Sequence, residues 1–163
     1  MPYVRTNKLR FVDFLGVESA TTYQGTPYFF LFDEIDSHDS EELRQHLTLF
    51  VEKQLAFVWY RTSKGFHIIS LSMLDLKAWD LARKELQRLR RNHFPNLVIR
   101  IERKPADSWH LYFENQDFSQ KWKVSSSLLQ MYERKFQVKI NIPSEQLVKT
   151  PLLFTHYTQV TLV

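Results

Sequence analysis

Arg61-Thr-Ser-Lys-Gly-Phe-His67 runs directly into Ile68-Ile-Ser-Leu71, and this stretch is typical of a basic turn followed by a buried strand with a histidine at its start. The chain has only 3 glycines in 163 residues. We therefore expect Gly65 to supply a backbone conformation that a residue with a Cβ atom adopts only with strain. An ordinary turn leading into a strand, with a surface histidine, explains the same residues.

A second stretch, Tyr28-Phe-Phe-Leu-Phe32, is a strand-forming apolar run that ends abruptly in the acidic sequence Asp33-Glu-Ile-Asp36. Strand alternation places Glu34 and Asp36 on one face and Asp33 on the other. Two carboxylates on one face suit a divalent cation such as Mg²⁺ or Mn²⁺, because hard cations prefer oxygen ligands. A capped loop in which these acids bind nothing is the alternative.

Hydrophobic periodicity predicts the remaining elements. Helices are expected at residues 40–53, 75–92 and 119–135, and strands at residues 55–60, 66–72, 136–142 and in the tail 152–163. Segments 97–102 and 109–113 are expected to form a hairpin, and Trp122 is expected on the buried face of the third helix. This order predicts one α+β domain over residues 1–163, with helices packed on a largely antiparallel sheet.

Composition limits the class of protein. Hydrophobic residues make up 44% of the chain and charged residues 25%, which is ordinary for a globular domain and argues against disorder. There is no cysteine, so disulfides, thiolate metal sites and cysteine nucleophiles are excluded. No apolar run has the length of a membrane span, and the N-terminal sequence lacks a signal-peptide pattern. We therefore expect an intracellular protein with no membrane partner.

The charge of the chain, +4 overall, is unevenly distributed. The segment between residues 83 and 104 contains eight Lys or Arg residues and only two Glu residues. Such a segment can contact the phosphates of a nucleic acid. A solvated helix face is the alternative interpretation of the same pattern.

The two motifs together resemble those of the archaeo-eukaryotic primase superfamily. The family's paired acids separated by an apolar residue are matched by Glu34-Ile35-Asp36, and its histidine motif near a glycine is matched by Ser63-Lys-Gly-Phe-His67. The resemblance covers about residues 28–115 and implies a primase-type, RRM-like sheet. It also implies that the acids Glu34 and Asp36, with Asp33 beside them, hold a catalytic Mg²⁺ or Mn²⁺.

The resemblance also implies that Ser63, Lys64 and His67 contact the phosphates of a nucleoside triphosphate. The chemistry of nucleotidyl transfer adds Arg61 and Arg100 as candidates, because it needs positive side chains to take up phosphate charge. Nucleic acid would lie along Lys84, Arg88, Arg91 and Lys104, with Trp109 available for stacking. The family's third acid has no counterpart in residues 90–96, so Glu102 is the expected substitute, with Glu114 as the second choice. Glu102 then completes a catalytic set with Glu34, Asp36 and His67.

The expected function is metal-dependent nucleotidyl transfer on DNA, in preference to RNA, in the replication or repair of a mobile element or virus. A non-catalytic protein that binds single strands through exposed aromatic rings is one alternative. A metal-dependent nuclease and a structural adaptor are two more. The chain has no His-x-His motif, no Walker phosphate loop and no dinucleotide fingerprint, which excludes the enzyme classes that those motifs define.

Overall fold

The computed structural model describes residues 8–89, 99–100, 109–112 and 122–162. The longer strands are β1 (Leu9–Val17), β3 (Thr26–Ile35), β5 (Phe66–Asp75) and β10 (Phe154–Leu162). The shorter strands are β2 (Ala20–Tyr23), β4 (Phe57–Arg61), β6 (Ile99–Arg100), β7 (Trp109–Tyr112), β8 (Val124–Ser125) and β9 (Leu147–Val148). The helices are α1 (Ser40–Glu52), α2 (Leu76–Leu89), α3 (Ser126–Phe136) and the 3₁₀ turn η1 (Ser144–Gln146).

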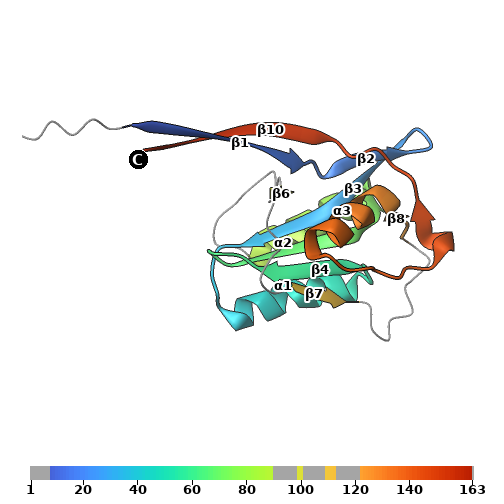
Figure 1. Ribbon diagram of the computed structural model, residues 1–163. Coiled ribbons are helices and arrows are strands. Elements are labelled where there is room, and N and C mark those ends of the chain that lie inside the picture. The colour runs from blue at the N-terminus through green and yellow to red at the C-terminus, as the bar shows by residue number, and fades with distance from the viewer. Residues whose placement is uncertain (1–7, 90–98, 101–108, 113–121, 163) are drawn as a thin grey trace, which may run out of the picture.

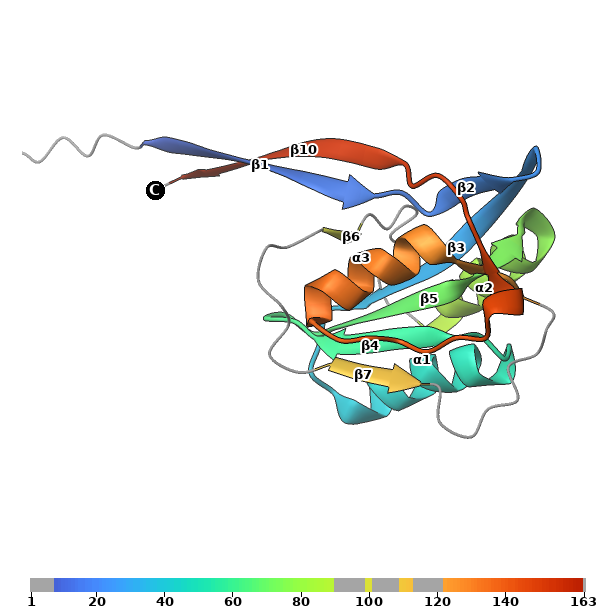
Figure 2. The same cartoon turned by 45° about the vertical axis from the view of Figure 1, so that its right-hand side comes forward.

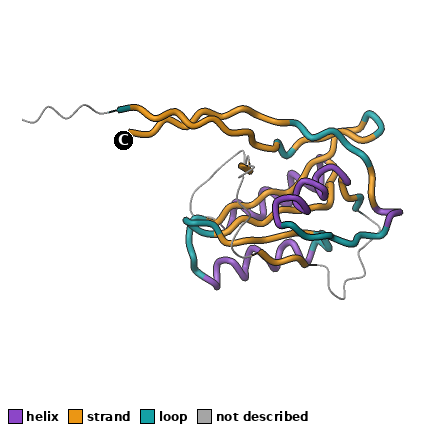
Figure 3. Tube along the Cα trace, in the orientation of Figure 1, coloured by secondary structure: helices purple, strands orange, loops and turns teal. Residues whose placement is uncertain are grey.

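The strands form two sheets in a mixed α+β structure. The main sheet has the order β2-β3-β5-β4-β7, with all of these neighbours antiparallel, and the short β8 and β9 attach to it through β5. The smaller sheet has the order β10-β1-β6. Most of this smaller sheet is a long ribbon of β1 and β10 that extends away from the helices (Figure 3). The predicted fold class, α+β with a mostly antiparallel sheet, is confirmed.

Helices cover both faces of the main sheet (Figures 1 and 2). On one face α1 and α2 pack against Leu31, Phe57 and Ile68. On the other face α3 packs against Phe30 and Tyr60. Most apolar residues of β3 and β5 are therefore buried whichever way they point, which explains their nearly continuous apolar sequences.

A register shift in the β3–β5 pair sets the position of the acidic residues. Phe30 pairs with Met73, but Phe32 pairs with Ile69. Ser70 lies at this irregularity, where its hydroxyl accepts a hydrogen bond from the Leu31 amide at 2.9 Å and donates one to a carbonyl at 2.7 Å. The shifted register continues to the end of β3 and brings Glu34 opposite His67.

The predicted first helix is confirmed at residues 40–52, and the predicted second helix is observed from residue 76 to the end of the described range at residue 89. The third helix was predicted to begin at residue 119, but residues 122–125 are not helical and α3 begins at Ser126. Ser125 caps α3 by accepting a hydrogen bond from the Leu128 amide at 3.2 Å. Trp122 therefore lies outside the helix, and its indole donates to the Lys53 carbonyl at 3.0 Å.

Two predictions for strands were wrong. Residues 137–142 form no strand, because Gln137 takes a left-handed conformation that ends α3 and turns the chain back along it. The expected hairpin of residues 97–102 with 109–113 is also absent where its residues are described. Instead β6 pairs with β1 in the small sheet, and β7 pairs with β4 at the edge of the main sheet.

Candidate functional site

The acidic end of β3 carries two carboxylates in close proximity. Glu34 is half-buried near the end of the strand, and Asp36 is exposed just beyond it. Partial loss of hydration raises the pKa of Asp36, and the charge and hydrogen bond of Glu34 raise this pKa further. The two acids therefore behave as an interacting pair, as their spacing in the sequence predicts.

His67 lies beside this pair on the neighbouring strand. It is directly opposite Glu34 in the β3–β5 register, with 3.9 Å between His67 Nε2 and Glu34 Oε1. Its other ring nitrogen, Nδ1, lies 3.1 Å from the hydroxyl of Tyr60 on β4. The histidine is thus held between an acidic and a phenolic partner on three adjacent strands.

Tyr60 also contacts Lys135, near the end of α3. The Lys135 ammonium lies 4.6 Å from the centre of the Tyr60 ring and donates to the hydroxyl at 3.4 Å. Lys135 can only donate, so the Tyr60 oxygen accepts from it, and the Tyr60 hydroxyl links Lys135 to His67 Nδ1.

Sequence reasoning missed both Tyr60 and Lys135. Tyr60 was assigned to a buried strand and Lys135 to the end of a helix, and their contact joins positions 75 residues apart. No local pattern in the sequence links them.

The basic turn holds its shape through short-range hydrogen bonds. The Thr62 amide donates to the Gly65 carbonyl at 2.8 Å, and the Gly65 amide donates to the Thr62 hydroxyl at 3.0 Å. Arg61, Ser63 and Lys64 are exposed around it. The charge of Lys64 lowers the pKa of Asp36, against the larger effects that raise it, so the turn lies within electrostatic reach of the acids.

Gly65 is required for a reason other than the predicted one. Gly25 is the glycine that takes a positive φ, of 77°, and Gly65 does not. A Cβ atom on Gly65 would instead lie 1.7 Å from the Ile35 carbonyl oxygen and 2.8 Å from the Ser37 amide nitrogen. The glycine thus allows the basic turn to pack directly against the end of the acidic strand.

Asp33 is separated from the other two acids. It is buried on the face of the sheet that α1 covers, and its Oδ2 lies 2.6 Å from Nδ1 of the buried His46 on α1. The loss of hydration lowers the pKa of His46, which the charge of Glu42 offsets in part. Asp33 therefore forms an internal pair with His46, on the opposite face of the sheet from Glu34.

The predicted nucleic-acid residues on α2 also lie away from the acids. Lys84 and Arg88 are exposed on a helix that packs on the same face as α1, whereas Glu34 and His67 occupy the face that α3 covers. Lys84 forms an ion pair with Asp80 at 2.9 Å. A nucleic acid bound along α2 would therefore have to pass around the sheet to reach the acidic pair.

The remaining predicted residues are placed only in part. Trp109 begins β7, opposite Tyr60 in the β4–β7 register, so its backbone lies one strand away from the site. Arg100 lies on β6, which belongs to the other sheet. Arg91, Glu102, Lys104 and Glu114 lie outside the described residues.

The described residues contain no cluster of three or more His, Cys, Asp or Glu side chains that could hold a metal ion. The pair of Glu34 and Asp36 still matches the needs of Mg²⁺, which commonly takes one or two protein carboxylates and completes its shell with water and substrate phosphates. The raised pKa of Asp36 is consistent with this use, because a cation between the two carboxylates would relieve their repulsion.

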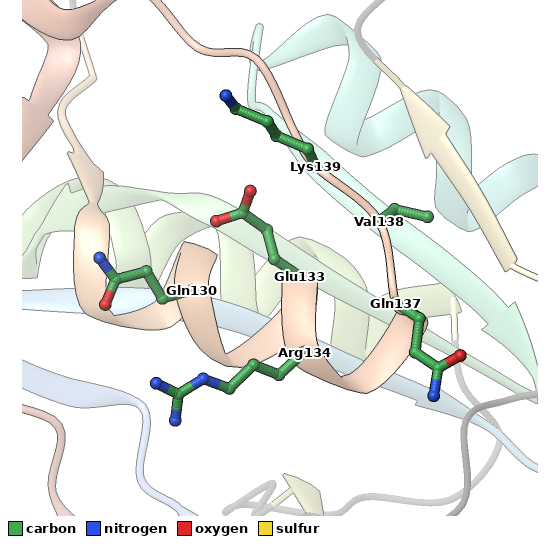
Figure 4. Close-up of a pocket in the computed structure, with 6 residues that line it drawn as sticks. All are labelled: Gln130, Glu133, Arg134, Gln137, Val138 and Lys139. Atoms are coloured by element: carbon green, nitrogen blue, oxygen red, sulfur yellow. The ribbon is translucent and has the colours of Figure 1, made fainter.

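A separate shallow pocket of about 450 Å³ lies between α3 and the segment that follows it (Figure 4). Its lining consists of Gln130, Glu133, Arg134, Gln137, Val138 and Lys139. The Glu133 carboxylate already accepts a hydrogen bond from the Ile140 amide at 3.0 Å. This pocket contains none of the residues predicted from the sequence, and its exposed charges are of both signs.

Comparison of the chain with protein-family models, with curated proteins and with solved structures gave no match. Among the helices within the described ranges, none is long and apolar enough to cross a membrane.

Proposed function

We propose that this chain is a primase-polymerase-like protein that carries out metal-dependent nucleotidyl transfer in the replication or repair of DNA of a mobile element or virus. The observation that carries the proposal is that the acidic motif and the histidine motif lie next to each other in the fold. Glu34 and Asp36 form a coupled acidic pair, His67 lies opposite Glu34 at 3.9 Å, and the turn with Lys64 packs against the end of the same strand. These are the residues that the resemblance to primases assigns to metal and phosphate binding.

The topology is consistent with this proposal. β5 lies between β3 and β4 and is antiparallel to both, so β3 and β4 are parallel and joined through α1. Together with α2 on the same face, this is the order of a split βαβ unit. It supports a primase-type, RRM-like sheet as the core of the protein.

The charges around the pair suit a triphosphate. Nucleotidyl transfer requires neutralisation of phosphate charge and of the charge on departing pyrophosphate. A bound Mg²⁺ or Mn²⁺ would supply part of this neutralisation by contacting phosphate oxygens. Lys64, whose charge acts on Asp36, and Arg61 lie on the turn and offer positive charge. Lys135 on α3 adds a positive charge over Tyr60, and His67 offers a hydrogen bond.

The alternative of a single-strand-binding protein of the RRM type is less well supported. Such proteins stack bases on aromatic rings that the open face of the sheet exposes. In the described part of this sheet, the corresponding rings of Phe30, Phe32 and Tyr60 are buried beneath α3, with exposed fractions of 0, 5 and 3%. Binding in that mode would require α3 to leave the sheet.

Nucleotide binding tests the proposal. We would titrate a nucleoside triphosphate by calorimetry, with and without Mn²⁺, into the wild type and the E34A/D36A variant. The control is E52A/E145A, which removes the same charge from exposed positions on α1 and η1. We expect Mn²⁺-dependent binding that weakens at least about tenfold in E34A/D36A, equivalent to the loss of roughly 1.4 kcal/mol, and is retained in the control.

Absence of binding in all conditions, or binding that survives in E34A/D36A, would overturn the proposed site. If metal-dependent binding is found, primer synthesis and degradation of labelled single strands would be compared with the same variants. Degradation without synthesis would identify a nuclease, which can use a similar carboxylate pair.

A further inference from the structure

The ribbon of β1 and β10 is an unusual feature of this fold. The two strands pair along their whole length, from Leu9 opposite Leu162 to Val17 opposite Phe154. The described part of β6 pairs with the base of this ribbon only, at Gly16 and Val17. The rest extends away from the helices and the main sheet (Figures 1 and 2). A two-stranded ribbon without further support is marginally stable in water.

One face of the ribbon exposes large apolar side chains. Phe11 has an exposed fraction of 62%, and Val160, its direct partner on β10, has 51%. Leu9, Leu15 and Phe154 on the same face are also exposed. Scattered apolar side chains on a surface need no explanation, but five on one face of a projecting ribbon indicate a contact surface.

Among the strands that the structure describes, β10 forms one outer edge of the small sheet, because β1 is its neighbour and β6 lies beyond β1. Natural edge strands are usually protected from pairing with another chain by charged side chains, proline or a bulge. The sequence Phe154-Thr-His-Tyr-Thr-Gln-Val-Thr-Leu162 contains no Lys, Arg, Asp, Glu or Pro, and its register with β1 is unbroken. β10 therefore has none of these protections.

We propose that β10 pairs with β10 of a second copy of this chain, antiparallel and about a twofold axis at Thr158. Phe154 of one copy then lies opposite Leu162 of the other, and His156 lies opposite Val160. Residues of the exposed apolar face meet residues of that same face, and no two like charges are opposed. The result is a continuous four-stranded sheet, β1-β10-β10-β1, with a larger apolar face than either ribbon has alone.

β1 is less suited to the same role. Unlike β10, β1 contains the charged residues Arg10 and Asp13, and β6 pairs with the base of its other edge. The proposal therefore commits to the β10 edge and to a second copy as its occupant. It does not depend on the chemistry of the Glu34–Asp36 site.

The twofold axis at Thr158 makes a sharp test possible. In T158K two lysines face each other across the interface, which opposes pairing. Within one copy the new lysine lies beside Asp13, whose carboxylate accepts the Thr158 hydroxyl at 2.8 Å, so the ribbon itself should persist. Sedimentation velocity over a range of concentrations should give a dimer for the wild type and a dissociation constant about fivefold larger for T158K.

The matched control is L9K, which adds the same charge to the apolar face on β1. Under edge pairing L9K leaves the dimer intact. A dimer that T158K preserves and L9K disrupts would show that copies meet through the faces of the ribbon, and would overturn the proposal. A wild-type protein that remains monomeric at all concentrations would also overturn the proposal.

The absence of cysteine from the chain allows a direct test of register. Cα atoms of directly opposed residues in an antiparallel pair are close enough for a disulfide to form. We expect T158C to form a cross-linked dimer under mild oxidation, whereas T48C, on the exposed face of α1, should not. Equal cross-linking of the two variants, or none in T158C, would contradict pairing centred on residue 158.

Discussion

Glu34 and His67 occupy directly opposed positions on β3 and β5, with 3.9 Å between Glu34 Oε1 and His67 Nε2. This pairing joins the acidic motif to the histidine motif, which are separated in sequence by a helix and a strand. It depends on the register shift between Phe30 and Phe32, because the register of Phe30 with Met73 would bring Ile69 opposite Glu34 instead. The local irregularity in the sheet thus creates the site.

Replacement of Asp36 by asparagine should increase stability at neutral pH while it removes metal-dependent nucleotide binding. The native pKa of Asp36 lies above its ordinary value of 3.8. The contribution of Asp36 to stability is therefore most favourable below that value. It is lost as the pH rises through the native pKa, because the ionised carboxylate is partly deprived of hydration and is repelled by Glu34. Since an exposed pair is worth less than about 1 kcal/mol, D36N should melt roughly 1–3 °C higher at pH 7.

Thermal melts at pH 3.5 and pH 7 would check this prediction. The increase in the melting temperature of D36N over that of the wild type should be present at pH 7 and absent at pH 3.5. The control E145Q neutralises an exposed acid on η1 and should change neither melt. A lower melting temperature for D36N at pH 7 would show that Asp36 stabilises the fold rather than a bound cation.

Substitution of Gly65 by alanine should strongly destabilise the protein. The added methyl group would lie 1.7 Å from the Ile35 carbonyl oxygen, which belongs to the backbone and cannot move independently of β3. We expect a loss of about 2–3 kcal/mol in urea denaturation, which is typical of overpacking at a rigid position.

The control is G25A, in the tight turn between β2 and β3. A Cβ atom on Gly25 would have no neighbouring atom within 4 Å, so the positive φ of 77° is the only feature that disfavours alanine there. Such backbone strain costs about 1 kcal/mol. Equal losses for G65A and G25A would indicate that the close approach of the turn to β3 relaxes easily.

Local patterns in the sequence predicted the acidic strand, the basic turn and the first two helices because each depends on residues close in the chain. The opposite faces of Glu34 and Asp33 follow from strand alternation alone, and the structure agrees with them. The contacts that complete the site could not be predicted in this way. Lys135 reaches Tyr60 only because α3 crosses the sheet, and the reversal of the chain at Gln137 replaced an expected strand.

The buried pair of His46 and Asp33 should make stability depend on pH. His46 Nε2 is buried without a hydrogen-bond partner among the described residues, so protonation would place an unpaired N–H in the interior. The loss of hydration lowers the pKa of the native ring, whereas the unfolded ring titrates near its ordinary value of 6.5. Below that value the unfolded state therefore binds more protons, and stability falls as the pH decreases.

Urea denaturation at pH 5, 6 and 7.5 would measure this dependence. One such group can contribute up to about 1.4 kcal/mol per pH unit between its native and unfolded pKa values. H46Q can still donate a hydrogen bond to Asp33 but does not titrate, so its stability should vary less between pH 5 and 7.5. H38Q, at an exposed position, should retain the wild-type dependence. If the free energy of unfolding of H46Q changes with pH as steeply as that of the wild type, groups other than His46 cause the pH dependence.

The contact between Lys135 and Tyr60 leads to the last prediction, which concerns nucleotide affinity. In K135M the long apolar side chain can still cover the Tyr60 ring, but the positive charge over Tyr60, the residue that contacts His67, is lost. If a triphosphate binds near Glu34 and Asp36, K135M should weaken its Mn²⁺-dependent binding about five- to tenfold, as expected for one lost charge contact of roughly 1–1.4 kcal/mol. The neighbouring R134M removes the same charge from the pocket side of α3 and should have little effect. Equal weakening by both variants would mean that the overall charge of α3, and not the position of Lys135 over Tyr60, attracts the ligand.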